Sequence, residues 1–287
     1  MEIDSETRLC CLIGHPVKHS ISPLLHNTAF KQLGLKMVYL AFDVEPRYLS
    51  RVVKGLKSLN VAGFNVTIPH KVSIMRLLDV IDSTSMETKA VNTVALKDGK
   101  LIGYNTDIEG VKRSLIDSNC MLDGRALVIG AGGAARAAIV ALKELGVKEI
   151  VIANRSIWRA ATLVRIFKDE GLKMKSVNLY EAKRYSRASS IIINATPIGM
   201  WPYMDETPLS SNDIPRNSVV LDLVYNPLKT KLLEEAEKAG AETISGLKPL
   251  IEQAVKAFEI WTGFQPPKDT LWRIGEEALR RRGGREE

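Results

Sequence analysis

The chain has 287 residues, 45% of them hydrophobic and 25% charged, which is the balance of a soluble globular protein with one large or two moderate domains. It has no run of about 18 apolar residues, as a membrane span requires, and the charged residues 1–8 do not resemble a secretory signal, so we expect a cytoplasmic protein. The net charge is +7, but the basic residues are spread along the chain without a nucleic-acid module, so we expect small anionic ligands and neither nucleic acid nor membrane as partners.

Three cysteines, Cys10, Cys11 and Cys120, show no spacing with histidine that would form a zinc site. We therefore expect reduced structural cysteines and no metal.

The first hundred residues alternate apolar runs with helical spacing. The expected elements are a strand at 8–14, a helix at 22–34, a strand at 37–43, a helix at 46–59, a strand at 63–68 and a helix at 72–78. Ser22 before Pro23 is a good N-cap and first-turn pair, which accounts for Ser22 but not for Ser20. The two hydroxyls together suit a polyol or a carboxylate.

The strand expected at 63–68 has one apolar and one polar face. Three apolar side chains should enter the core: Phe64, Val66 and Ile68. Asn65 and Thr67, on the other face, need either water at a sheet edge or a bound ligand. Lys71 follows at the start of a helix, where a cation is disfavoured by the helix dipole, and such a broken local rule indicates function.

A short helix at 84–90 and a hairpin come next. Strands at 92–96 and 101–105 flank the turn signal Asp98-Gly99. Residues 106–109 form a capping-box pattern, so Asp107 has an ordinary role as a first-turn acid beside any functional one.

A glycine-rich turn follows the apolar run 125–129. In the sequence Gly130-Ala-Gly-Gly-Ala-Ala135, Gly130 would allow a tight turn, Gly132 would let backbone N–H groups approach a pyrophosphate, and Ala135 would let helix pack on strand. A turn that needs glycine only for its conformation would look similar. A second apolar run at 149–153 completes a β-α-β unit and favours the dinucleotide interpretation.

Asn154 and Arg155 follow that second strand, where the adenosine ribose is read. An acid there would bind the 2′-hydroxyl of NAD, whereas an amide and a guanidinium suit the 2′-phosphate of NADP. The alternative is that Ser156 caps the next helix and Arg155 is a solvated charge.

Further strands at 175–178, 190–194 and 219–224 alternate with helices and predict a parallel sheet covered on both faces. The loops at 195–200 and 225–227 leave carboxyl ends of strands, where such sheets place ligands. Helices at 230–239, 247–263 and 268–279 close the chain, and Gln253 borders the apolar stripe of the second.

These motifs together resemble the shikimate dehydrogenase family over nearly the whole chain. The matching stretches occur in the family's order: 14–16, 20–23, 65–71, 90–93, 105–107, the loop at Gly130, Asn154-Arg155, 195–200 and Gln253. The resemblance implies reversible NADPH-dependent reduction of the 3-ketone of 3-dehydroshikimate in aromatic amino-acid biosynthesis.

The resemblance also implies roles for individual residues. Lys71 and Asp107 are the family's catalytic pair and also bind substrate, with Asp107 positioning Lys71. Ser20 and Ser22 would hold the substrate carboxylate. The other substrate residues would be Asn65, Thr67, Asn92 and Gln253. Tyr225 is a further candidate from its place after a strand, where a tyrosine is as often there for packing. The cofactor residues would be Gly130, Ala131, Gly132, Gly133, Ala134, Ala135, Asn154, Arg155, Arg159, Thr196, Met200, Val224 and Gly246.

The implied fold is α/β with two domains. Residues 1–106 would form an α/β substrate domain, residues 107–245 a Rossmann-like NADP domain with a parallel sheet, and residues 246–287 helices returning to the substrate domain. The active site would lie in the cleft between the domains. One departure is Pro249-Leu250, where the family usually has methionine near the nicotinamide; a proline in a first helical turn should not break the helix.

Two alternatives remain open. A quinate or mixed quinate/shikimate dehydrogenase would share the motifs, but Ser22 in place of a bulkier threonine and Arg155 in place of an acid favour shikimate and NADP. An inactive NADP-binding module would not need Lys71 and Asp107. The oligomeric state stays open as well, a homodimer included.

Overall fold

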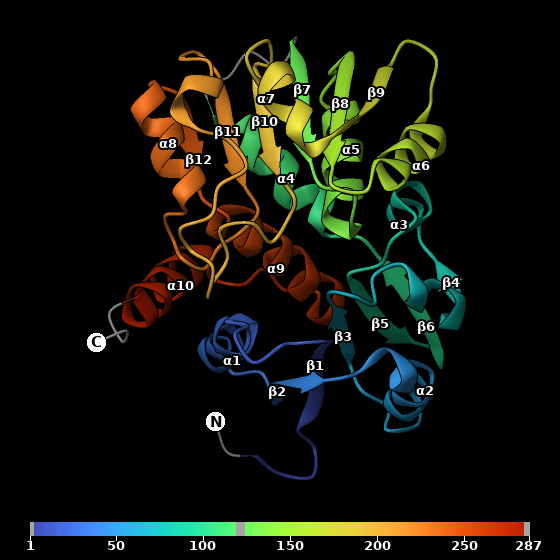
Figure 1. Ribbon diagram of the computed structural model, residues 1–287. Helices are drawn as coiled ribbons and strands as arrows, with labels where there is room; N and C mark the ends of the chain where they lie inside the picture. The colour runs from blue at the N-terminus through green and yellow to red at the C-terminus, as the bar shows by residue number, and fades with distance from the viewer. Residues whose placement is uncertain (1–2, 119–123, 284–287) are drawn as a thin grey trace. The chain divides into compact units, whose positions relative to one another are not determined.

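The computed structural model describes residues 3–118 and 124–283 and divides into two compact units. The first unit comprises residues 1–106 and 253–278, and the second comprises 107–252 and 279–287. Each unit is built on one six-stranded sheet (Figure 1). The α/β class expected from the sequence is confirmed, and helix α9, Leu247–Thr262, contributes residues to both units.

The first sheet has the order β2-β1-β3-β5-β6-β4 and is mixed. Parallel pairs join β1 to β2, β1 to β3 and β4 to β6, whereas β3, β5 and β6 are antiparallel neighbours. The strands are β1 Arg8–Gly14, β2 Met37–Asp43, β3 Gly63–Val66, β4 Val80–Ile81, β5 Thr93–Lys97 and β6 Lys100–Tyr104. Residues 97 to 100 close the expected hairpin.

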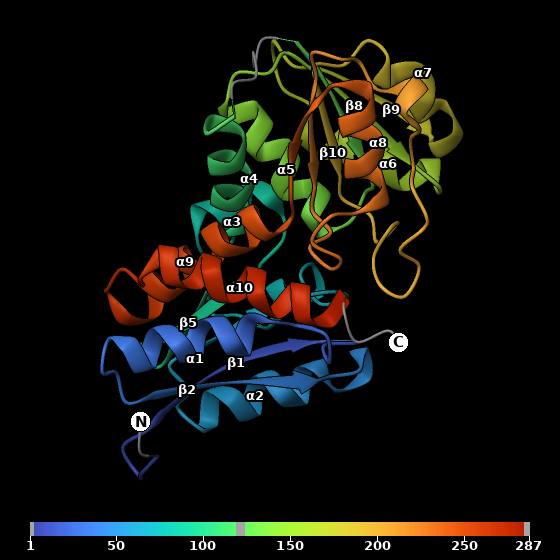
Figure 2. The same ribbon diagram turned by 90° about the vertical axis from the view of Figure 1, so that its left-hand side faces the viewer.

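Helices cover both faces of this sheet. In Figure 2, α1 lies on one side of β1 and β2 and α2 on the other. Leu49, Val53 and Leu56 of α2 pack in one core cluster with Ile13 and Phe64 of the sheet. The helices of this unit are α1 Ser22–Gln32, α2 Leu49–Ser58, α3 Ser83–Thr88 and the short 3₁₀ helices η1 Pro46–Tyr48 and η2 Ser73–Leu77; α10, Lys268–Gly283, begins in it.

Two local expectations are wrong. Strand β3 ends at Val66, so Ile68 lies beyond the sheet and is 64% exposed, although it was expected in the core. The helix expected at 72–78 is a 3₁₀ turn, and Lys71 lies two residues before it. The dipole argument about Lys71 therefore loses its physical basis, because a five-residue 3₁₀ segment has little aligned dipole.

Cys10 and Cys11 lie in β1, between β2 and β3, and are buried and free. Burial raises the pKa of the Cys11 thiol to about 12 and also raises the pKa of Cys10. Reduced structural cysteines are thus confirmed for these two positions. Cys120 lies outside the described residues.

An aromatic cluster attaches helix α9 to the first sheet. The His26 ring stacks on Tyr39 with centroids 4.5 Å apart and lies 5.2 Å from Trp261, while Phe30 and Phe258 are 5.1 Å apart. These rings come from α1, β2 and α9, so helices distant in sequence share one core.

Trp261 also donates a hydrogen bond from its indole Nε1 to the carbonyl oxygen of Val94, at 2.9 Å. Gly63 makes this contact possible, because a Cβ at residue 63 would lie 2.2 Å from that Nε1 atom and 2.4 Å from the Val94 oxygen. The indole packs directly against the strand backbone because Gly63 has no side chain.

The second sheet is entirely parallel and has the order β12-β11-β10-β7-β8-β9. This is the doubly wound order of a Rossmann fold, with the switch point between β7 and β10. Figure 1 shows the six strands side by side in this order. They are β7 Arg125–Ile129, β8 Glu149–Asn154, β9 Lys173–Asn178, β10 Ile191–Asn194, β11 Val219–Asp222 and β12 Glu242–Ile244.

Helices cover both faces of the second sheet as well. Successive residues of β7 alternate between the two core clusters: Val128 packs with α4, α5 and α6, whereas Leu127 packs with α7 and α8. Because both faces are buried, the inner strands β7, β10 and β11 are almost entirely apolar, whereas the edge strands β9 and β12 are partly exposed. The helices are α4 Asp107–Ile116, α5 Gly133–Glu144, α6 Ile157–Phe167, α7 Ala182–Ser186 and α8 Lys231–Ala239, with 3₁₀ helices η3 Leu179–Glu181 and η4 Ser211–Asp213.

A buried carboxylate lies at the carboxyl edge of this sheet. Asp222, the last residue of β11, has no exposed surface. It accepts hydrogen bonds from Asn194 Nδ2 at 2.9 Å, from the Val224 backbone N–H at 3.0 Å and from Thr230 Oγ1 at 2.6 Å. Burial raises the pKa of Asp222 to about 6, against the lowering effect of these three donors.

Substitution of Gly63 by alanine tests the fit of Trp261. The added Cβ would collide with the indole and with strand backbone, so we expect the free energy of unfolding to fall by about 2 kcal/mol or more. Gly55→Ala is the matched control: it lies in α2 with no atom near the position of a Cβ, so alanine should be neutral or stabilise by up to about 1 kcal/mol. Urea unfolding followed by circular dichroism measures both, and equal stabilities of the two variants would contradict the prediction.

His26 makes the stability of the protein depend on pH. Burial lowers its pKa from 6.5 to about 3, so between these values the unfolded chain binds a proton that the folded chain does not. The free energy of unfolding therefore falls with pH below 6.5, by about 1.4 kcal/mol for each pH unit.

Replacing His26 by phenylalanine, which keeps a ring in the cluster, should remove this dependence. The stability of the variant relative to the unaltered protein should rise by about 2 kcal/mol between pH 7 and pH 5 in urea unfolding. A difference that stays constant over that range would show that His26 is protonated in the folded protein.

Candidate functional site

Two serines lie at the start of the first helix. The hydrogen bond that supports this start was expected from Ser22 but comes from Ser20. Ser20 Oγ accepts a hydrogen bond from the backbone N–H of Ser22 at 3.2 Å, so Ser20 supports the start of α1. Ser22 is the first residue of the helix and is buried; Ile21 is its N-cap residue. The conformational explanation thus applies to Ser20, and it leaves the buried Ser22 hydroxyl for another role.

Asn65, at the centre of the first sheet, has partners from the protein itself. Its Oδ1 atom accepts a hydrogen bond from Tyr39 Oη at 2.6 Å, and its Nδ2 atom donates to Asn92 O at 3.2 Å and to Thr93 Oγ1 at 3.0 Å. The amide of Asn65 is therefore held in one orientation. Thr67 is half-buried at the end of the same stretch.

Asn92 is the hub of a polar cluster that includes Gln253. The Oδ1 atom of Asn92 accepts from the Thr106 backbone N–H at 2.7 Å, and its Nδ2 atom donates to Thr106 Oγ1 at 2.9 Å and to Gln253 Oε1 at 3.4 Å. Thr106 Oγ1 also donates to Gln253 Oε1 at 3.4 Å. Asn92 and Gln253 are 161 positions apart in the sequence, and their side-chain amides are neighbours in this cluster.

Tyr39, Thr93 and Thr106 were not singled out from the sequence, although they orient three of the residues that were. Nothing in the local pattern marks Tyr39, because its partner Asn65 lies 26 residues later. Thr93 is the first residue of β5 and Thr106 follows β6; both are buried polar residues, and the sequence spacing does not reveal their burial.

Lys71 lies in the loop between β3 and η2, where its side chain is half-buried. Its carbonyl oxygen accepts a hydrogen bond from the Val91 backbone N–H at 2.7 Å, which fixes the Lys71 backbone beside the residue before Asn92. Asp107 belongs to the second unit, where it is the first residue of α4 and half-buried. The expected catalytic pair therefore comes from both units.

The glycine-rich turn of the second unit has the backbone that phosphate binding requires. Gly130 has φ +117°, and a Cβ there would lie 2.7 Å from the Ala195 carbonyl oxygen, so only glycine fits. At Gly132 a Cβ would meet no protein atom within 4 Å, so open space lies over the backbone there. Gly132 also caps the twelve-residue helix α5 without any side-chain hydrogen bond to its N–H groups. This cradle fits a phosphate.

Asn154, at the end of β8, uses its Nδ2 atom to donate to Ser156 O at 2.9 Å, which shapes the turn into α6. Ser156 is the N-cap residue of α6 but makes no side-chain capping bond. Arg155 and Arg159 are exposed, and the Arg159 guanidinium lies 5.2 Å from the centre of the Trp158 ring. Two cations are thus presented to solvent near the carboxyl end of β8.

Two further loops leave the same edge. Thr196 follows β10, and both its backbone N–H and its hydroxyl donate to Asn194 Oδ1, at 3.1 and 2.6 Å. A Cβ at Gly246 would lie 2.4 Å from the Val224 carbonyl oxygen, so the segment before α9 packs directly on the segment after β11. Met200 is 45% exposed and Tyr225 is half-buried.

Pro249 is the third residue of α9, which continues to Thr262. The expectation that this proline would not break the helix is confirmed.

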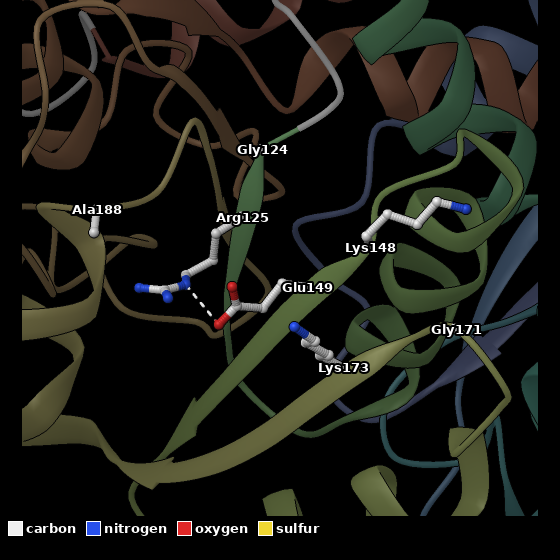
Figure 3. Close-up of a pocket in the computed structure, with 7 residues that line it drawn as sticks. All are labelled: Gly124, Arg125, Lys148, Glu149, Gly171, Lys173 and Ala188. Atoms are coloured by element: carbon white, nitrogen blue, oxygen red, sulfur yellow. Dashed lines mark ion pairs between the residues drawn. The ribbon is translucent and has the colours of Figure 1, made fainter.

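A separate hollow of about 400 Å³ lies at the opposite edge of the second sheet. Figure 3 shows its lining, with the ion pair between Arg125 and Glu149, whose Nε and Oε1 atoms are 2.8 Å apart. Arg125, Glu149 and Lys173 are the first residues of β7, β8 and β9. Because ligands of doubly wound sheets bind at the carboxyl ends of the strands, this hollow is not the candidate site.

Within residues 3–118 and 124–283, no group of three His, Cys, Asp or Glu side chains is arranged to hold a metal ion. No helix in the described part of the chain has both the length and the apolar character needed to cross a bilayer.

Three family profiles match the chain in order. Residues 12–94 match the shikimate dehydrogenase substrate binding domain, residues 114–202 match shikimate/quinate 5-dehydrogenase, and residues 246–273 match the shikimate 5′-dehydrogenase C-terminal domain. The first and third profiles thus fall mostly on the first unit and the second on the second unit.

Individual relatives agree with these profiles. The NADP(+) shikimate dehydrogenase of Methanopyrus kandleri is 46% identical over 98% of this chain and 99% of its own length. A crystal structure of a shikimate dehydrogenase with NADP+ is 42% identical, covers 97% of this chain and 98% of its own, and has a TM-score of 0.88. A quinate dehydrogenase from Corynebacterium glutamicum with NAD has a TM-score of 0.85 at 29% identity, over 93% of this chain and 98% of its own. By these full-length similarities the chain belongs to the shikimate dehydrogenase family.

Proposed function

We propose that this protein is an NADP-dependent shikimate dehydrogenase, which reversibly reduces 3-dehydroshikimate to shikimate in the synthesis of aromatic amino acids. The observation that carries the proposal is the identity of 46% to such an enzyme over 98% of the chain, with the family's motifs present in order and one departure at Pro249-Leu250. The geometry of both units is compatible with the chemistry.

The first unit supplies groups that bind a polyhydroxylated acid. Asn92 and Gln253 present amide groups from one polar cluster, and Asn65 is held in a fixed orientation beside it. Amides both donate and accept, so they suit hydroxyl groups. Ser20 and Ser22 bind the carboxylate, and Thr67 adds a hydroxyl. Tyr225, from the second unit, completes the set of substrate residues that we propose.

The second unit supplies the groups that bind NADP. The backbone at residues 130–135 and the start of α5, whose N–H groups no side chain caps, would hold the pyrophosphate. Arg155 and Arg159, with Asn154, would bind the 2′-phosphate. Thr196, Met200, Val224 and Gly246 come from segments that leave the same edge of the sheet. These residues would hold the nicotinamide half.

Lys71 and Asp107 carry the acid–base chemistry. The bound cofactor supplies or accepts the hydride. In the direction of reduction, the Lys71 ammonium group stabilises the developing negative charge on the carbonyl oxygen and donates a proton to it. In the direction of oxidation, Lys71 removes that proton from the hydroxyl. Asp107, acceptor-only when ionised, receives a hydrogen bond from a neighbouring substrate hydroxyl and orients the ring.

Quinate is the second candidate substrate, because quinate dehydrogenases share the fold, as the Corynebacterium glutamicum protein does. Ser22 and Arg155 favour shikimate and NADP, and the identity to that quinate enzyme is 29% against 46% to the shikimate enzyme. We also propose a cytoplasmic location and leave a homodimer open as the oligomeric state; light scattering of the purified protein would measure its mass in solution.

Lys71→Ala should lower kcat for NADP+ reduction by shikimate by about a hundredfold or more, because acid–base catalysis is worth about that factor. The absorbance of NADPH measures the rate, and the Kd of NADP+ should stay unchanged. Lys54→Ala, which removes an exposed lysine of the same unit, is the control and should keep full activity.

The same assay tests the proposed function. A higher kcat/KM for quinate with NAD+ than for shikimate with NADP+ would assign the protein to the second candidate. No turnover of either acid by the unaltered protein would leave only an NADP-binding module, and full activity of Lys71→Ala would remove Lys71 from the mechanism.

Arg155→Ala should weaken NADP+ binding by about tenfold to a hundredfold, the loss expected for charge-assisted hydrogen bonds to a phosphate. Binding of NAD+, which lacks this phosphate, should change little. Arg165→Ala is the control, since Arg165 is another exposed arginine of the α6 segment. Calorimetric titration of the unaltered protein and the two variants gives the six dissociation constants. Equal losses for NADP+ and NAD+ in Arg155→Ala would show that Arg155 does not read the 2′-phosphate.

A further inference from the structure

Asp222 is unusual among the buried groups of the second unit, because a carboxylate without exposed surface is held by neutral donors. An ionised carboxylate only accepts hydrogen bonds. It is costly to bury, and the raised pKa of about 6 reflects that cost. An apolar residue at this position would avoid the cost, so the carboxylate calls for an explanation.

The carboxylate fixes the orientation of a second side chain, Asn194. The Asn194 amide donates from Nδ2 to Asp222 Oδ1 and also to the Ile198 carbonyl oxygen at 3.2 Å. If the amide turned over, its oxygen would face the carboxylate oxygen, and two acceptors would repel each other. Asp222 therefore directs Asn194 Oδ1 toward the loop after β10.

That oxygen in turn holds Thr196. Asn194 Oδ1 accepts from both the backbone N–H and the hydroxyl of Thr196, and the Thr196 hydroxyl accepts from the Ile198 N–H at 3.2 Å. The loop at 195–200 thus has its conformation set by a chain of hydrogen bonds that ends on Asp222.

The same carboxylate holds two other segments. Its Oδ1 atom accepts from the Val224 N–H, which sets the turn after β11. Its Oδ2 atom accepts from Thr230, the residue whose side chain caps α8 by accepting from the Leu233 N–H. Gly246 packs against this turn, since a Cβ there would lie 2.8 Å from the Asp222 carbonyl oxygen.

We propose that Asp222 is a positioning residue for the cofactor: acting through Asn194 and Thr230, it locks the segments that carry Thr196 and Val224 in the conformation that receives NADP. The inference rests on the proposed function and deepens it, because both segments supply residues assigned to the cofactor. Asp222 itself is buried beneath them and need not touch the ligand.

Asp222→Asn tests the role with almost no change in size. The new amide can either accept a hydrogen bond from Asn194 or donate one to it. Asn194 is therefore no longer held in a single orientation. We expect the Kd of NADP+, measured by calorimetry, to rise by about tenfold, as for a lost hydrogen bond to a charged group. At saturating NADP+, the KM for shikimate should rise by a clearly smaller factor than this Kd, because among the proposed substrate residues Tyr225 alone follows the turn that Asp222 holds.

Three other variants separate positioning from general destabilisation. Thr230→Val removes one donor and should also weaken NADP+ binding, whereas Thr230→Ser keeps the hydroxyl and should restore it. Val177→Ala leaves a small cavity in the buried core of the same unit and should lower the thermal unfolding temperature without changing the Kd of NADP+.

The proposal is overturned if Asp222→Asn binds NADP+ within twofold of the unaltered protein. It is also overturned if the KM for shikimate rises by as large a factor as the Kd of NADP+, or if Val177→Ala weakens NADP+ binding as much as Asp222→Asn does. Failure of the unaltered protein to bind NADP+ would overturn the proposed function as well, and so the two failures are distinguishable.

Discussion

The architecture of this chain depends on glycines at three positions, where another part of the chain packs directly against the backbone. Gly63 admits the Trp261 indole onto the first sheet, Gly130 admits the segment after β10, and Gly246 packs on the turn after β11. At each position a Cβ would overlap protein atoms, so any other residue would push two segments apart. Residues that lie far apart in the sequence are thereby brought within the reach of single hydrogen bonds.

Two polar hubs make use of that proximity. Asn92 in the first unit and Asp222 in the second each connect segments through three or more hydrogen bonds. In both hubs the side chain that coordinates the others is buried, whereas residues at the periphery, such as Gln253 and Thr196, are partly exposed. Such satisfied networks hold the peripheral groups in defined orientations before a ligand arrives, which lowers the entropy lost on binding.

Elements with strong periodicity could be predicted from the sequence, and features that depend on distant partners could not. The apolar run at Arg125–Ile129 is buried on both faces and was recognised, whereas Glu242–Ile244 forms an edge strand with one buried residue and gave no pattern. Ile68 was expected inside because alternation was extended past the end of the strand. Asn65 was expected to need water or ligand, but Tyr39, from another strand, satisfies it. Family motifs identified the candidate residues, while the groups that orient them became visible only in the structure.

Helix α9 starts in the second unit and ends in the first, so neither unit corresponds to one continuous stretch of the gene. His26 and Tyr39 are encoded near the start of the gene. Phe258 and Trp261, which complete the same aromatic core, are encoded near its end. A single crossover between two related genes would therefore combine half of this core from one parent with half from the other. A well-packed first unit therefore requires that both ends of the gene come from the same parent or from parents with compatible cores.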